Sequence, residues 1–95
     1  MNIQYVGFRV AATSRNYAFC VNDPATEARH FTVKIQAGVF RSTPLKFQDG
    51  PDICFARLRR ELERETQDSR AEPHLRIEDQ DILDYLERRR PRKRS

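Results

Sequence analysis

Residues 17–21 read Tyr-Ala-Phe-Cys-Val, and residues 31–35 read Phe-Thr-Val-Lys-Ile. Both stretches place large apolar residues at every second position, which is the pattern of a β-strand with one buried face. Residues 3–12 alternate in the same way and predict a third strand. Because short polar breaks separate the three stretches, we expect them to form an antiparallel meander.

The stretch 3–12 is apolar on both of its faces. A period of two puts Val6, Phe8 and Val10 on one face, and Ile3 and Tyr5 on the other. Such a strand needs cover on both faces, and the second helix or residues 37–50 of the same chain would supply it. A second copy of the chain would also supply it, since two-fold dimers are the commonest oligomers. The sequence leaves both explanations open.

A first helix is predicted to start near Asp49 or Gly50, either of which suits a cap, with Pro51 in the first turn. Its apolar stripe at helical spacing consists of Cys54, Phe55, Leu58 and Leu62. Ile53 lies about 150° from the centre of that stripe and is therefore expected on the outer side of the helix. Residues 37–50 fit a fourth strand, a helical turn or a packed loop equally well.

A second helix is predicted to start at a Glu78 or Asp79 cap, with Ile77 placed to pack against Ile82 as a hydrophobic staple. Its apolar side is expected to consist of Ile82, Leu83 and Leu86, with Tyr85 at the margin. Residues 67–76, between the two helices, are interpreted as a polar connection.

These elements predict an α+β fold with a three- or four-stranded antiparallel sheet, followed by two C-terminal helices packed on it. Ninety-five residues fit a single domain, which we place at residues 1–87. Residues 88–95 are expected to form a flexible basic tail. The net charge of the chain is +4, yet residues 1–87 hold 12 Lys and Arg against all 14 Asp and Glu, a net charge of −2. The basic character of the chain therefore comes from its last eight residues.

The sequence contains no recognised catalytic motif, and we expect a protein that is not an enzyme and uses no cofactor or metal. Its three glycines are far apart, so there is no Gly-rich phosphate loop. A catalytic Cys–His pair would have to combine Cys20 or Cys54 with His30 or His74. The same four residues could form a Cys₂His₂ zinc site, but the spacing of the cysteines is much wider than in structural zinc sites.

Two groups of basic residues are candidates for binding a polyanion such as nucleic acid. One group is a stripe on the first helix, and the other is the C-terminal run. They consist of Arg57, Arg60, Arg64, Arg88, Arg89, Arg90, Arg92, Lys93 and Arg94. Glutamates flank the stripe, so a solvated helix with internal ion pairs such as Arg57–Glu61 and Arg59–Glu63 explains it as well.

No apolar stretch is long enough to span a bilayer and no signal peptide is recognisable, so we expect a cytoplasmic protein with reduced cysteines. Our functional hypothesis is a non-catalytic protein-interaction module that binds a second copy of itself or another protein. The alternative is a nucleic-acid- or ribosome-associated accessory protein that uses the Arg-rich tail.

Overall fold

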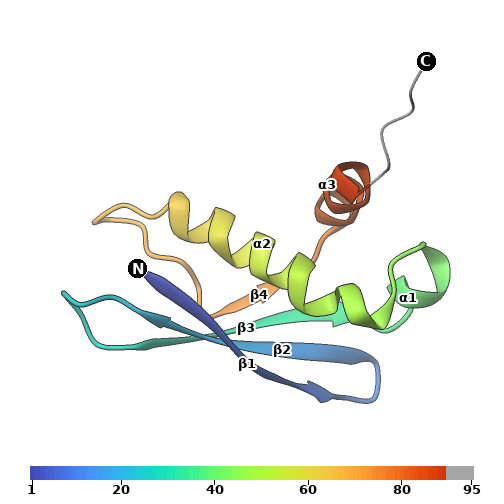
Figure 1. Ribbon diagram of the computed structural model, residues 1–95, viewed down its shortest axis with the longest axis horizontal. Coiled ribbons are helices and arrows are strands. Elements are labelled where there is room, and N and C mark those ends of the chain that lie inside the picture. Colours follow the sequence, from blue (N-terminus) through green and yellow to red (C-terminus); the bar gives the residue numbers. More distant parts are fainter. Residues whose placement is uncertain (90–95) are drawn as a thin grey trace.

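The computed structural model describes residues 1–89, and in this part of the chain every helix lies on one side of a four-stranded sheet (Figure 1). Helix α2 (Gly50–Glu63) runs along the sheet, and α3 (Asp79–Arg89) lies beside α2 and is seen end-on in this view. The opposite face of the sheet carries no helix from these residues. The predicted α+β class, with helices packed on a sheet, is confirmed.

The sheet has the strand order β1–β2–β3–β4. Strands β1 (Asn2–Val10), β2 (Ser14–Asn22) and β3 (Arg29–Gln36) form the predicted antiparallel meander. The fourth strand differs from the expectation, because β4 (His74–Arg76) pairs with β3 in a parallel orientation.

Strand β4 lies within the stretch that we interpreted as a polar connection. It has three residues and only one apolar side chain, the buried Leu75, so no alternation could reveal it. Backbone hydrogen bonds hold it against β3. The amide of Thr32 donates to the carbonyl of Pro73 at 2.8 Å, and the amide of Ile77 donates to the carbonyl of Lys34 at 2.9 Å.

Strand β1 contains a β-bulge between Tyr5 and Gly7, which overturns the simple alternation expected for residues 3–12. The bulge inserts Val6 as an extra residue, and Gly7 adopts φ 151°, a conformation that residues with a Cβ rarely adopt. Residues on either side of the bulge consequently share one face. Ile3, Tyr5, Phe8 and Val10 are paired with Val21, Phe19, Tyr17 and Arg15 of β2. The apolar side chains of β1 other than Val6 thus gather on the helix-bearing side of the sheet.

The core lies between the sheet and α2, and the predicted stripe of α2 is confirmed. Cys54, Leu58 and Leu62 are buried against the sheet, and Phe55 packs on the core with its ring 6.5 Å from that of Phe19. The placement of Ile53 on an outer side was wrong, since it is 1% exposed. Ile53 lies at the seam between α2 and α3, where it lines the same cleft as Asp81 and Asp84 of α3.

Helix α3 begins as predicted but turns a different face inward. Ile77 and Ile82 are both buried, and the carboxylate of Asp81 accepts a 2.8 Å hydrogen bond from the amide of Glu78, which caps the helix. Tyr85 is buried, whereas Leu83, expected on the apolar side, is 61% exposed. The reason is that Asp81 points inward to pair with arginines of α2, and this rotation carries Leu83 outward.

Residues 37–50, which the sequence left open, contain the short helix α1 (Val39–Ser42) and the 3₁₀-helix η1 (Phe47–Asp49). The rings of Phe40 and Phe47 lie 4.8 Å apart and hold the two turns together. Asp49 precedes α2 as expected, but its side chain makes no capping bond to α2. It accepts a 2.9 Å hydrogen bond from the amide of Lys46 and pairs with Arg89 of α3.

A further ion pair joins the end of α2 to β3. Arg29 donates two hydrogen bonds to the carboxylate of Glu65, which also accepts a 2.7 Å bond from the amide of Ala71. The hydrogen bonds from Arg29 lower the pKa of Glu65 below its ordinary value of 4.5. This pair fixes the loop that leads from α2 to β4.

Replacing Glu65 by glutamine should therefore make the stability of the domain less sensitive to acid. A carboxyl group whose pKa is lowered by folding stabilises the fold above its unfolded pKa, and this contribution is lost as the pH falls through the folded pKa. The measurement is urea denaturation of both proteins from neutral pH to below pH 4.5. A Glu65→Gln variant whose unfolding free energy falls as steeply as that of the unchanged protein would contradict this role.

Candidate functional site

Exposed apolar side chains gather on β1, which forms one edge of the sheet. Seven large apolar residues of the described chain are exposed, and five of them lie at positions 1–10: Met1, Tyr5, Val6, Phe8 and Val10. We call these five residues the β1 surface. Helix α2 contacts β1, and Ile3 packs against the core, but the other large apolar side chains of this outermost strand remain in solvent. Contiguous apolar surface of this kind marks an interaction site more often than isolated exposed residues do.

An arginine links the β1 surface to η1. The guanidinium of Arg15 lies 4.8 Å from the ring centroid of Phe8 and 4.1 Å from that of Phe47, so it is stacked between two exposed aromatic rings. The ring of Phe8 lies in turn 5.8 Å from that of the buried Tyr17. Arginine and aromatic residues are the side chains enriched at the centres of protein interfaces. Sequence alternation alone missed this cluster, because the bulge and η1 bring its members together.

The arginine stripe predicted on α2 is divided by the packing of α3. Arg57 donates to Glu61 at 2.5 Å and lies 3.6 Å from Asp81, and Arg60 pairs with the same aspartate. Both therefore lie in the seam between α2 and α3, with acidic partners, whereas Arg64 is exposed. The predicted pairs Arg57–Glu61 and Arg59–Glu63 are both present.

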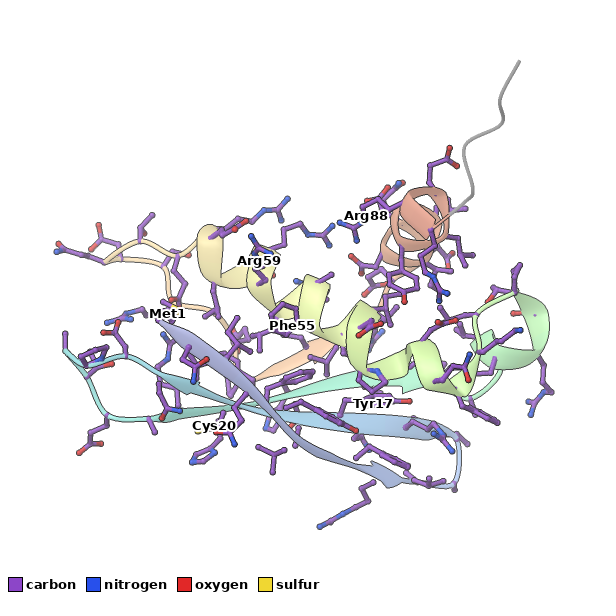
Figure 2. All side chains as sticks on the ribbon, in the orientation of Figure 1. Met1, Tyr17, Cys20, Phe55, Arg59 and Arg88 are labelled. Carbon is purple, nitrogen blue, oxygen red and sulfur yellow. The ribbon has the colours of Figure 1, made fainter. Side chains whose placement is uncertain are left out.

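A cleft of about 410 Å³ opens along this seam. Its charged lining has both signs: Arg57, Arg59, Arg60, Arg88, Glu63, Asp81 and Asp84. Figure 2 shows Arg59 and Arg88 on facing sides of the space between the two helices. The mixed charges neutralise one another, and we find no convergent set of polar groups there that would select a small ligand.

The C-terminal basic run begins inside α3. Arg88 and Arg89 are the last residues of that helix, and Arg89 pairs with Asp49. The other candidate residues of the run, Arg90, Arg92, Lys93 and Arg94, lie outside the described residues.

The two cysteines lie in different environments. Cys54 is buried in the core, and burial raises the pKa of its thiol, which opposes formation of a nucleophilic thiolate. Cys20 lies on the side of the sheet away from α2 (Figure 2). There it is paired across the ladder with His30, and its thiol lies 3.8 Å from the side-chain oxygen of Asn22. His74 is paired instead with Thr32. The structure thus brings together one of the four possible Cys–His combinations.

Within residues 1–89, no cluster of three or more His, Cys, Asp or Glu side chains is arranged to hold a metal ion. No helix in that part of the chain has both the length and the hydropathy needed to cross a bilayer.

Comparisons of the chain with protein-family models, with curated proteins and with solved structures give no significant match.

Proposed function

We propose that the protein is a non-catalytic interaction module whose β1 surface binds a second copy of the same chain. The observation that supports this proposal is the nine-residue edge strand β1, which is exposed along most of its length and is apolar on its helix-bearing side. The opposite edge, β4, has only three residues. Native proteins seldom leave a long apolar edge strand uncovered, because it invites pairing with other chains.

A second copy is the partner that fits this edge best, because a strand can always pair antiparallel with its own copy across a two-fold axis. Such pairing would join two four-stranded sheets into one and bring the two β1 surfaces together. The side chains would supply most of the free energy of association, since the bulge at Val6 interrupts the regular ladder along this edge.

The substitution Val6→Lys tests this proposal. Val6 is 63% exposed in the single chain, so the change should leave the fold intact, yet it would place a charge in the interface twice, once from each copy. If each valine contributes about 1–2 kcal/mol, dimerisation should weaken about 100-fold. The matched control is Leu83→Lys, because Leu83 is 61% exposed but lies on α3.

Light scattering coupled to size exclusion would give the masses of the three proteins. We expect twice the chain mass of 11.2 kDa for the unchanged protein and for the Leu83→Lys control, and the chain mass itself for Val6→Lys. A monomeric unchanged protein at tens of micromolar, or a Val6→Lys variant that remains dimeric, would rule out this interface.

A further inference from the structure

The face of the sheet that carries no helix, here called the outer face, is polar and lacks acidic side chains. Its members alternate along the strands with the buried core residues. They are Asn2, Gln4, Gly7, Arg9, Ser14, Asn16, Ala18, Cys20, Asn22, His30, Thr32, Lys34, Gln36, His74 and Arg76. Val6, which the bulge leaves without a partner, is not assigned to either face. Figure 2 shows the arrangement at two of the labelled positions, with Tyr17 toward α2 and Cys20 on the opposite side.

Acidic residues are absent from the sheet. The four strands contain five Lys and Arg and no Asp or Glu, and all 14 acidic residues lie in helices and loops. Residues 1–87 have a net charge of −2, yet the sheet within them is basic. Counting charge along the sequence did not reveal this, because the basic residues of the outer face come from three separate strands.

The strand register places the outer-face cations in one row. Arg9 is paired with Asn16, Asn16 with Lys34, and Lys34 with Arg76. The row therefore crosses all four strands at right angles to them. With neighbouring strands 4.7–4.9 Å apart, it is about 14 Å long.

These cations have no acidic partner within residues 1–89. Arg9, Lys34 and Arg76 make no ion pair there, whereas Arg29, Arg57, Arg60 and Arg89 all do. Lys34 and Arg76 also lie directly opposite each other in adjacent strands, an arrangement of like charges that destabilises a sheet. An anion bound across the row would remove that repulsion.

We propose that the outer face binds the phosphodiester backbone of a nucleic acid through the row Arg9–Asn16–Lys34–Arg76. Arginine, lysine and asparagine side chains are the groups that commonly contact phosphate oxygens. The outer face carries no Phe, Tyr or Trp, so recognition would depend on the backbone and not on stacking of bases. It also lacks the apolar centre typical of a protein interface. Arg9 shares β1 with the β1 surface, but its side chain lies on the face opposite to Phe8 and Val10, and binding by the row does not depend on dimerisation.

The test compares three full-length proteins in their binding to a fluorescent DNA duplex of mixed sequence over a range of salt concentrations. The first is the unchanged protein, and the second is the triple variant Arg9→Gln, Lys34→Gln and Arg76→Gln. The third is a control with the same net charge, Arg41→Gln, Lys46→Gln and Arg70→Gln, whose sites are exposed but lie off the sheet. The C-terminal basic run is present in all three, so its contribution cancels.

In a plot of log affinity against log salt concentration, the slope should be less negative for the outer-face variant by about 2.7. This value is about 0.9 for each of three lost phosphate contacts. The control should keep the slope of the unchanged protein. Equal slopes for all three proteins, or no binding by the unchanged protein at low salt, would overturn the proposal. Equal competition by polyglutamate would also overturn it, because the face would then recognise acidic chains in general.

Discussion

Replacing Asp81 by alanine should reduce the unfolding free energy of the domain by about 2–4 kcal/mol. The carboxylate is buried at the start of α3, where it pairs with Arg60, lies 3.6 Å from Arg57 and accepts the 2.8 Å bond from the amide of Glu78. Its removal leaves the two guanidinium groups without their shared partner and the amide uncapped. Glu61 still pairs with Arg57 and Asp84 still lies 3.8 Å from Arg60, but the Nε atom of Arg60 is already buried without a hydrogen-bond partner, and neither carboxylate replaces the bond to the amide of Glu78.

Urea denaturation would measure this loss, with Asp84→Ala as the matched control. Asp84 lies one turn along the same helix, 3.8 Å from Arg60, and its side chain is 47% exposed. Because exposed ion pairs contribute about 1 kcal/mol or less, the control should lose little stability. Losses of equal size in the two variants would show that the Asp81 network does not join α3 to α2 in the way described.

The second large effect is expected from Gly50→Ala, which should cost about 3 kcal/mol of unfolding free energy. A Cβ at Gly50 would come closer than 3.0 Å to the Oη, Cζ and Cε2 atoms of Tyr17. The ring of Tyr17 is 1% exposed and packed beneath the first turn of α2, so it has no space into which to move. The first turn of α2 must therefore shift away from the sheet.

The control for this substitution is Gly38→Ala. Both glycines have right-handed helical backbone angles, but a Cβ at Gly38 meets no atom within 4 Å. The Gly38 variant should therefore equal or slightly exceed the unchanged protein in stability. Thermal unfolding of the two variants would separate steric overlap from backbone effects. A Gly50→Ala variant as stable as the Gly38→Ala control would contradict the close approach of Tyr17.

The parts of the fold that depend on local periodicity could be predicted from the sequence. Three strands and the buried stripe of α2 follow from the spacing of apolar residues, and the staple at Ile77 and Ile82 follows from a short capping pattern. In each case a few neighbouring residues carry the signal, so tertiary context is not needed to recognise it.

The remaining features depend on contacts between distant residues. Ile53 lies at the seam where α3 packs beside α2, and Leu83 is exposed because Asp81 of the same helix turns toward α2. The bulge at Val6 changes which face of β1 the later residues occupy, and β4 is too short to show a period. A helical or alternating pattern contains no information about these contacts.

The β1 surface and the outer face could not be predicted from the sequence for the same reason. The apolar residues of β1 could be identified from the sequence, but the bulge is needed to place Ile3, Tyr5, Phe8 and Val10 on one face. The row Arg9–Asn16–Lys34–Arg76 requires the register of four strands, including the unpredicted β4. The sequence predicted a polyanion-binding stripe of arginines on α2 instead. In the structure, two of these arginines, Arg57 and Arg60, pair with acidic residues.

Amide hydrogen exchange of the full-length protein at high and low concentration tests the central claim, the binding of a second copy at β1, most directly. If two copies pair through this strand, the β1 amides that point away from β2 should exchange slowly at high concentration and faster on dilution. The β1 amides bonded to β2, and those of β2 and β3, should stay protected at both concentrations. Exchange along β1 that is independent of concentration would contradict the account.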